Sequence, residues 1–340
     1  MSAFPAWESV RRRAARHPLA AVVQASLVHV PKGACVMVAA SGGADSTALA
    51  VVAASVARRA GWSVELTTVD HGLRAGSAAD ADFVEALGAW MGVRVRRAKL
   101  RLTAGSAVAA RARDARYRAL ARTASDAKAA VVLLAHHADD QLETVLMRLV
   151  RGAGAAAAGG MPSRRRLSDG VALVRPLLER SRAELGGLLQ SCGVPWREDP
   201  SNADRSRVRG RLRHEVLPVL ESLRAGAAVR ASRTARRVRG AATSLRRRAA
   251  GLLSGDGPWA RARLRKAGAQ VLAVALRGAE PSAAEATVER MVAAVRDGVA
   301  RPRRFTLGSC EWTVRAREVT RTPIVRPGVT GGRGSPAVDQ

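Results

Sequence analysis

The segment 35–60 constrains the fold most, because its sequence predicts a strand, a glycine turn and a helix in immediate succession. The run from Cys35 to Ala40 is short and apolar, as in a fully buried strand, and an alanine-rich helical stretch ends at Ala60. Between them lies the loop Ser41-Gly42-Gly43-Ala44-Asp45-Ser46. Unpaired backbone N–H groups in such a turn and the positive end of the helix face one point, so the segment predicts an anion site. Gly42 and Gly43 allow a positive φ and a close approach by phosphate oxygens.

The loop lacks the Gly-Lys-Ser/Thr ending of a Walker loop and contains no lysine. Phosphate charge must therefore be met by Mg²⁺ and by arginines from elsewhere, and Asp45 is the expected metal contact. The alternative is an ordinary turn, since glycine pairs are common in loops. The preceding strand and the Asp45-Ser46 pair favour nucleotide binding. The pattern SGGxDS resembles the signature of the ATP pyrophosphatases, which cut ATP between the α and β phosphates.

Strands and helices are predicted to alternate after this segment, which indicates an α/β fold with a doubly wound parallel sheet and right-handed crossovers. The predicted strands are 63–69, 93–99 and 130–135, and the predicted helices are 77–91, 106–123 and 138–151. Such sheets bind ligands at the carboxyl ends of their strands. Asp70 and His71 follow the second strand, where we expect them to contact the nucleotide, with an ordinary turn as the alternative.

The second chemical cluster follows the fourth predicted strand and reads His136-His137-Ala138-Asp139-Asp140-Gln141-Leu142-Glu143-Thr144. Asp139 or Asp140 with Glu143 places like charges three or four residues apart, which costs roughly a few tenths of a kcal/mol unless a cation lies between them. One acid alone would be explained by the helix dipole. Two Asp and one Glu beside two His instead predict a cation site, for Mg²⁺, an amino-group substrate or both.

The charge balance implies a polyanionic partner. Lys+Arg 57 against Asp+Glu 28 gives a net charge of +29, which suits nucleic acid or a membrane surface. No apolar segment has the length of a membrane span and no leader is recognised, so we expect a soluble cytoplasmic protein. The cysteines are far apart without a CxxC pair, which indicates neither a disulfide framework nor a zinc or iron–sulfur site. Arg113 and Arg116 of the predicted helix 106–123 are, by themselves, typical of a solvated face.

The chain is predicted to hold one large domain and a second, smaller, mainly helical one. We expect residues 1–34 to form a leading helix and linker, residues 35–220 to form the catalytic domain, and residues 221–300 to form a basic helical domain. Residues 301–340 are expected to contain a short β-like pair, at 304–307 and 311–314, followed by a disordered tail. Arginine recurs at every second position from Arg205 to Arg213. Because helical sequence follows, we interpret this stretch as a loop entering a helix.

Six motifs in this order resemble the tRNA(Ile)-lysidine synthetase family, over about residues 35–218. They are the loop SGGADS, Val69 to Arg74, Ala112 to Tyr117, His136 to Thr144, the glycine-rich stretch Arg151 to Pro162, and Asp199 to Asn202. Four residues depart from the family pattern, namely Ala109, Ala157, Ala158 and Gly210. These departures bear on the closure of a mobile loop and on the orientation of one arginine, not on the reaction.

The resemblance implies ATP-dependent attachment of L-lysine to the wobble cytidine of a minor isoleucine tRNA with a CAU anticodon, through an adenylated tRNA and with Mg²⁺. It implies catalytic roles for Asp45, Arg113, His136, Asp140 and Glu143. It implies nucleotide binding by Ser41, Gly42, Gly43, Ala44, Asp45, Ser46, Asp70 and His71. It implies substrate binding by Asp139, Asp140, Glu143, Arg116, Arg209 and Arg213.

Several alternatives stay open at this point. Which acid holds lysine and which holds Mg²⁺ is undetermined, as is the oligomeric state. The nearest rival function is that of another tRNA-modifying enzyme of the same class, such as a tRNA thiolase, and the missing CxxC pair argues against it. A catalytically silent RNA-binding relative is the second rival, and the intact Asp45, Asp140 and Glu143 argue against that.

Overall fold

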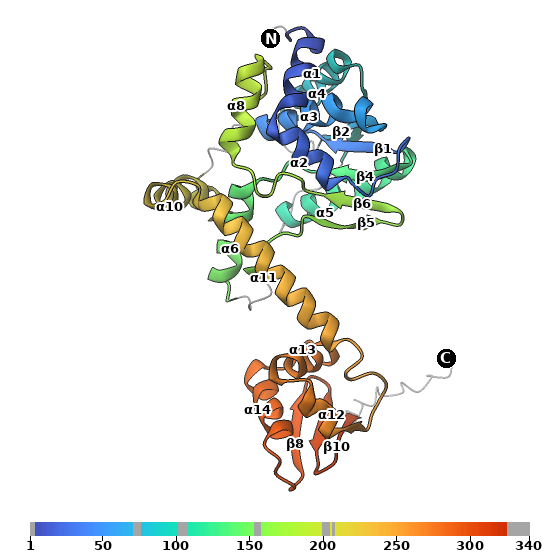
Figure 1. Ribbon diagram of the computed structural model, residues 1–340, viewed down its shortest axis with the longest axis vertical. Helices are drawn as coiled ribbons and strands as arrows, with labels where there is room; N and C mark the ends of the chain where they lie inside the picture. The colour runs from blue at the N-terminus through green and yellow to red at the C-terminus, as the bar shows by residue number, and fades with distance from the viewer. Residues whose placement is uncertain are drawn as a thin grey trace, which may run out of the picture. The chain divides into compact units, whose positions relative to one another are not determined.

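The computed structural model describes residues 4–70, 76–100, 108–152, 158–198, 205 and 208–324, and it divides into two compact units, Met1–Arg239 and Gly240–Gln340 (Figure 1). The domain bounds expected at 220 and 300 differ from this division. Helix α11 (Ala227–Ala249) begins inside the first unit, and the expected β-like segment shares one core with helices of the second unit. Within the described ranges, no helix combines the length and the apolarity needed to cross a bilayer.

A six-stranded sheet forms the centre of the first unit, in the order β3-β2-β1-β4-β6-β5 (Figure 1). Its strands are β1 (Cys35–Ala39), β2 (Ser63–Asp70), β3 (Arg94–Lys99), β4 (Ala129–Leu133), β5 (Arg164–Ser168) and β6 (Val171–Val174). All neighbours pair in parallel except β5, which is antiparallel to β6. The predicted doubly wound fold is confirmed. Strand β5 was not predicted, because its run of three arginines hides the apolar alternation that marks a strand.

Helices cover both faces of this sheet, because successive residues of a strand point to opposite sides. Val36 and Val38 of β1 join a core with helices on one face. Met37 and Ala39 belong to a separate cluster on the other face, which includes Leu120 of α5 (Val108–Asp126). The helices of the first face are α1 (Trp7–Arg16), α2 (Pro18–Ser26), α3 (Ala44–Ala60), α4 (Ser77–Met91) and α8 (Arg182–Cys192).

The chain between the sheet and α11 brings arginines over helix α6 (Ala138–Val150). It forms α9 (Val208–Arg211), the π-helical turn η2 (Leu212–Val216) and α10 (Leu217–Leu223). Leu142 of α6 packs with Leu217 of α10 and Ala228 of α11 in a small apolar cluster. The expectation that the arginine-rich stretch enters a helix is confirmed from Val208 onward. Single π-helical turns are frequent at functional sites.

The second unit combines helices with an antiparallel sheet of order β7-β10-β9-β8. Its elements are β7 (Trp259–Ala260), α12 (Arg261–Lys266), α13 (Ala269–Ala279), α14 (Glu285–Arg296), β8 (Arg303–Leu307), β9 (Cys310–Val314) and β10 (Glu318–Pro323). The predicted pair is confirmed as β8 and β9, and β7 and β10 extend it. Stacking of Trp259 on Trp312, with ring centroids 5.4 Å apart, anchors the core. The tail from residue 325 lies outside the described residues.

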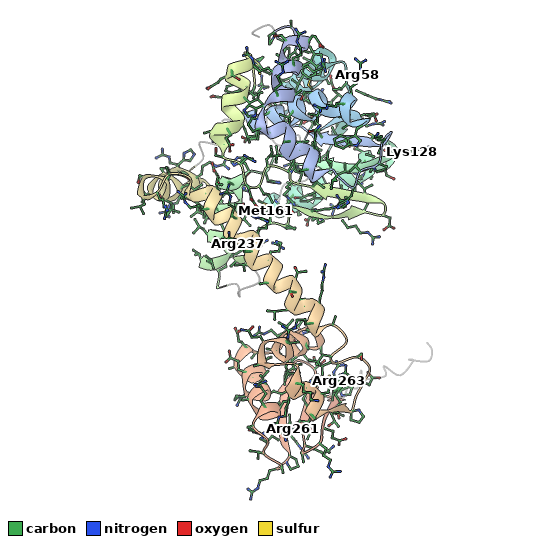
Figure 2. The ribbon with its side chains drawn as sticks, in the orientation of Figure 1. Arg58, Lys128, Met161, Arg237, Arg261 and Arg263 are labelled. Carbon is green, nitrogen blue, oxygen red and sulfur yellow. The ribbon has the colours of Figure 1, made fainter. Side chains whose placement is uncertain are left out.

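A buried arginine fastens the second unit together. Arg261, labelled in Figure 2, is 2% exposed. Its guanidinium donates to the carbonyl oxygens of Ala294 (2.6 Å), Val295 (3.0 Å) and Val299 (2.7 Å), and to Asp297 Oδ1 (3.1 Å). The carbonyls at the end of a helix lack partners within the helix. Arg261 supplies such partners at the end of α14, which is a structural role.

Candidate active site

The loop Ser41–Ser46 leaves β1 and enters α3, as predicted. The Ser41 N–H donates to Ser46 Oγ at 3.0 Å, and the Ser46 hydroxyl donates to the Gly43 carbonyl at 3.1 Å. Gly43 is the N-cap of α3, and no side chain among the described residues caps this helix end. The first N–H groups of α3 are therefore available to an anion, where the helix dipole also favours negative charge.

Gly42 has to be glycine in this structure. Its φ is +83°, and a Cβ atom there would lie 3.2 Å from Phe83 Cδ1 and 3.5 Å from the Asp80 carbonyl oxygen. The Gly42 carbonyl accepts from the Arg197 N–H at 2.9 Å, and Arg197 Nε donates to Asp80 Oδ1 at 2.6 Å. The outer side of the loop is thus fixed by residues that follow it much later in the sequence.

A cavity of about 600 Å³ opens beside this loop. Ser41, Gly43, Asp45, Arg116, His136 and Trp196 are among the residues that line it. This volume lies within the range of roughly 300–1,000 Å³ typical of small-molecule sites. The lining combines backbone donors of the loop, a carboxylate, a guanidinium and an aromatic ring, which suits a nucleotide.

The two arginines of α5 have different positions. Arg116 lines the cavity, and no acidic partner is recorded for it among the described residues. Burial lowers the pKa of Arg116, and the charge of Arg113 lowers it further, whereas Tyr117 raises it. Arg113 is exposed and donates to Tyr117 Oη at 3.2 Å. The solvated-face interpretation therefore holds for Arg113 and is wrong for Arg116. A cation beside the phosphate loop supplies the positive charge that the loop itself lacks.

Asp45 has the geometry expected of a metal-binding carboxylate. Its Oδ2 lies 3.5 Å from His137 Nε2, whereas its Oδ1 is buried and has no hydrogen-bond partner. A buried carboxylate oxygen without a donor calls for a cation. The described residues contain no group of three or more His, Cys, Asp or Glu side chains that could hold a metal by themselves. One carboxylate plus substrate phosphates is a usual way to bind Mg²⁺, so Asp45 fits that ion.

The imidazole of His137 connects the phosphate loop to the acidic cluster of α6. It is 3% exposed and its Nε2 lies 3.5 Å from both Asp45 Oδ2 and Asp140 Oδ2, while its Nδ1 lies 3.9 Å from Asp139. Burial alone would lower the pKa of His137, but the bond to Asp45 and the charges of Asp140 and Asp139 raise it. A protonated His137 partly neutralises the surrounding carboxylates.

Two arginines occupy the predicted cation site of α6. Arg209 donates to Glu143 Oε2 at 2.5 Å and to Asp140 Oδ1 at 2.9 Å. Arg213 donates to Glu143 Oε1 at 2.8 Å and to Asp140 Oδ1 at 3.2 Å. Glu143 is 0% exposed and Asp140 is 8% exposed, and buried carboxylates require such partners. The expected cation lies between the acids, but here it comes from the chain itself.

The third acid of α6 has a different environment. Asp139 is 27% exposed at its side chain, and its nearest charged partner is His137. The pKa of Asp139 is raised overall. Burial is the largest cause, the charge of His137 opposes it, and the negative charges of Asp140, Glu221 and Glu143 add to the increase. Asp139 does not line the cavity. It is the α6 carboxylate that is least committed to arginine.

Asp70 has protein partners of its own at the end of β2. Its carboxylate accepts from Ser77 Oγ at 2.7 Å and pairs with Arg97 at 3.3 Å, and it is not among the lining residues of the cavity. Asp70 ends β2 and is engaged by side chains of α4 and β3, and its contact with the nucleotide stays a prediction. His71, Ala157 and the motif Asp199 to Asn202 lie outside the described residues, and Gly210 lies in α9.

Several residues of the site were missed by sequence reasoning. Gln141 donates to the Met161 carbonyl at 3.0 Å and accepts from the Met161 N–H at 2.6 Å, which fastens the end of the glycine-rich stretch to α6. Arg175 follows β6 directly and donates to His136 Nδ1 at 3.2 Å. The signal for Arg175 was present, because a lone arginine after an apolar strand sits at the ligand-binding edge of a parallel sheet.

The fold and the loop define a class: a doubly wound α/β domain whose glycine loop and helix start form a phosphate site. Residues 16–220 match the family model described as a PP-loop domain. The tRNA(Ile)-lysidine synthase of Salinispora arenicola is 44% identical over 229 residues, which cover 65% of this chain and 68% of that protein. The chain belongs to the ATP-binding PP-loop family, and within it to the tRNA(Ile)-lysidine synthases.

Other relatives bear the same description. The tRNA(Ile)-lysidine synthase of Salinispora tropica is 47% identical over 214 residues, which cover 62% of this chain and 61% of that protein. That of Thermobifida fusca is 44% identical over 201 residues, or 58% of this chain and 60% of that protein. The chain therefore matches less than two thirds of the length of both relatives.

A solved structure shares the fold. The U34-tRNA thiolase NcsA from Methanococcus maripaludis, determined with its 4Fe–4S cluster, superposes with a TM-score of 0.55 at 15% identity, over 68% of this chain and 79% of that one. At this identity the likeness concerns the architecture of the chain.

Proposed function

We propose that the protein ligates L-lysine to the C2 position of the wobble cytidine in the CAU anticodon of a minor isoleucine tRNA, using ATP. The observation that carries the proposal is the imidazole of His137, which lies 3.5 Å from both Asp45 and Asp140. His137 thus brings the phosphate loop close to the acidic helix, which supports a shared site. The names of the relatives and the PP-loop match support the same reaction.

Two half-reactions are required. In the first, the C2 oxygen of the cytidine attacks the α-phosphorus of ATP, and pyrophosphate leaves. The N–H groups at the start of α3 and the guanidinium of Arg116 would hold the phosphates. When bound at Asp45, Mg²⁺ would neutralise phosphate charge. In the second half-reaction the ε-amino group of lysine attacks C2, its proton is lost, and AMP leaves.

Lysine would be recognised by the carboxylates of α6. Asp139 has the fewest competing partners, while Asp140 and Glu143 are bound to Arg209 and Arg213. An ammonium group therefore reaches Asp140 or Glu143 only by sharing them with the arginines or replacing one. Free lysine, ATP and tRNA meet in the cytoplasm, which we propose as the location.

The tRNA would bind basic surfaces of the chain. Arg246, Arg247 and Arg248 of α11 are exposed, whereas Arg211 pairs with Glu215 and Arg213 with Glu143. Replacing Arg246 to Arg248 by Ala should weaken binding of all tRNAs alike and flatten the log–log salt dependence by roughly 0.7–0.9 per lost phosphate contact. Filter binding between low and moderate salt measures this, and an unchanged slope would place these arginines outside the interface.

The decisive experiment uses the purified full chain with ATP, lysine and an isoleucine tRNA carrying the CAU anticodon. Pyrophosphate release and nucleoside mass spectrometry are measured in parallel. The expected result is stoichiometric pyrophosphate and a cytidine that gains lysine with loss of water. Thiolated nucleoside would indicate the thiolase reaction instead, and an unmodified tRNA without pyrophosphate would refute the proposed function.

A further inference from the structure

Arg175 is a buried cation without a carboxylate partner. It is 3% exposed, and the acids of the described residues form no ion pair with it. Its side chain donates instead to three neutral acceptors: Pro162 O at 2.9 Å, Tyr117 Oη at 3.2 Å and His136 Nδ1 at 3.2 Å. A buried guanidinium held this way is costly, and such groups are usually retained for a specific purpose.

The direction of the bond to His136 follows from chemistry. A guanidinium has five donors and no acceptor, and it stays protonated in proteins. The Nδ1 atom of His136 must therefore be the unprotonated nitrogen. In a neutral imidazole the proton is then on Nε2, because the bond made by one ring nitrogen sets the state of the other.

The Nε2 atom of His136 has no recorded hydrogen-bond partner among the described residues. His136 lines the cavity beside Ser41, Gly43 and Asp45. Its recorded hydrogen bond within the described part of the chain is the one from Arg175 to Nδ1. His136 follows β4 and Arg175 follows β6, and Leu133 and Val174 are paired in the parallel sheet. Both side chains thus lie at the sheet edge where such folds bind ligands.

We propose that Arg175 is a positioning residue that fixes His136 as a neutral Nε2–H donor to an anionic oxygen of the nucleotide in the cavity. This inference rests on the proposed function for the identity of that oxygen. The catalytic role that the resemblance implies for His136 would then be donation and not proton abstraction, since Nε2 carries a proton and the Nδ1 lone pair accepts from Arg175.

The surroundings of His136 support a neutral imidazole. Burial lowers the pKa of His136 to about 3, against the charge of Asp140 and with the help of Arg175, Arg116 and Arg209. A histidine that stays neutral suits a phosphate site, because the hydrogen bond that it donates does not change in strength over the physiological pH range.

The first test needs no catalysis. The full chain is labelled with ¹⁵N-histidine, and the His136 resonances are assigned by their loss in His136→Gln. Imidazole ¹⁵N shifts should show the Nε2–H tautomer without titration between about pH 7.5 and 5, where a free histidine would titrate. A proton on Nδ1, or a midpoint in the ordinary range, overturns the proposal from the wild type alone.

Variants then assign the effect to Arg175. Arg175→Ala should release the imidazole, so that tautomers mix and titration returns. Arg165→Ala is the matched control, because Arg165 lies over the Tyr117 ring at 4.5 Å but is not bonded to His136. Its His136 signals should match the wild type. Unchanged His136 signals in a folded Arg175→Ala chain refute the positioning role.

Kinetics separate a donor from a base. Glutamine can donate from near the Nε2 position but cannot take a proton. His136→Ala should lose roughly ten- to a hundredfold in kcat/KM for ATP in pyrophosphate release, as for a lost bond to a charged group. His136→Gln should retain most of the wild-type kcat/KM. If His136→Gln loses as much kcat/KM as His136→Ala, His136 acts as a base. If the wild-type chain releases no pyrophosphate, the proposed function is refuted. The tautomer of His136 is tested separately, by the imidazole spectra.

Discussion

Asp45 and Asp140 both lie 3.5 Å from His137 Nε2, yet the charge of Asp45 and the charges of the Asp140–Glu143 pair are compensated in different ways. Asp45 has a buried oxygen with no donor, whereas the pair receives four guanidinium bonds from Arg209 and Arg213. In both regions the carboxylates lie near the carboxyl ends of the strands of one sheet. The regions differ in whether the polypeptide supplies the compensating cation or a ligand would have to supply it.

We propose that this contrast reflects separate tasks, a point that the sequence left open for the acids of α6. A carboxylate oxygen that receives no bond from the protein suits a metal that also binds phosphate. Carboxylates already paired with arginine can accept a new cation only through exchange, which favours a substrate that arrives and departs. The structure thereby points Mg²⁺ toward Asp45 and lysine toward α6, as a hypothesis for the four experiments that follow.

The largest effect is expected from removing the charge of Asp45. Asp45→Asn keeps the shape of the side chain but cannot hold a divalent cation well, so pyrophosphate release should fall about a thousandfold, the equivalent of several kcal/mol of charge stabilisation. Single-turnover assays over a Mg²⁺ series measure it. Asp126→Asn, on the exposed end of α5, is the control. Near-normal pyrophosphate release by Asp45→Asn would show that Asp45 does not hold the metal and would contradict the comparison.

The arginine pairs should contribute to stability. Arg209→Ala leaves Arg213 as the remaining arginine partner of Asp140 and of the fully buried Glu143. We expect the free energy of unfolding to drop by about 1–3 kcal/mol. Arg211→Ala removes an exposed ion pair from the same segment and should cost about 0.5 kcal/mol or less. Urea unfolding compares the two. Equal losses would mean that burial of the α6 acids is not what Arg209 compensates.

Glu143→Gln tests the second half of the comparison. With one carboxylate lost, adenylated tRNA should accumulate and the lysine concentration needed for half-maximal rate should rise roughly tenfold or more, as for about 1.4 kcal/mol of binding. Lysine titrations with mass analysis of the tRNA give both numbers, and Glu215→Gln on the exposed turn serves as control. Loss of adenylation with an unchanged lysine requirement would move Glu143 to the nucleotide side.

The last prediction concerns how the stability of the fold depends on pH. The folded pKa of His136 is lowered to about 3, so between that value and its ordinary pKa the unfolded chain binds the extra proton. Stability should fall on acidification through this window, by at most about 1.4 kcal/mol per pH unit from this group. His136→Gln should show a shallower decline from pH 6.5 to 4.5 than wild type, with exposed His29→Gln as control. Parallel slopes would contradict a neutral His136.

The sequence predicted those parts of the site that are local. The strand, turn and helix of 35–60 follow from apolar length and glycine placement, and the two clusters after β1 and β4 meet because parallel strands end at one edge. The guanidinium partners were not predictable in the same way. Arg209 reaches Glu143 across 66 residues, and Arg175 reaches Tyr117 across 58. No periodicity in a window of residues encodes such pairs.

The same limit explains the misplaced elements. β5 carries three arginines and β7 has two residues, so neither shows a strand pattern on its own. Their pairing with β6 and β10 supplies the hydrogen bonds that define them. Asp70 was expected at the nucleotide because it ends a strand, but Arg97 and Ser77 compete for it. Strand ends indicate where a ligand binds without showing which side chains reach it.

The support of Gly42 by Arg197 has a consequence for the synthesis of the chain. Gly42 and Asp80 leave the ribosome early, while Arg197, which bonds to both, emerges more than a hundred residues after Asp80. At roughly 5–20 residues per second, this interval lasts several seconds. The nascent phosphate loop stays without this brace during that time, so we expect competence to bind nucleotide to arise only after the segment that follows α8 has been synthesised.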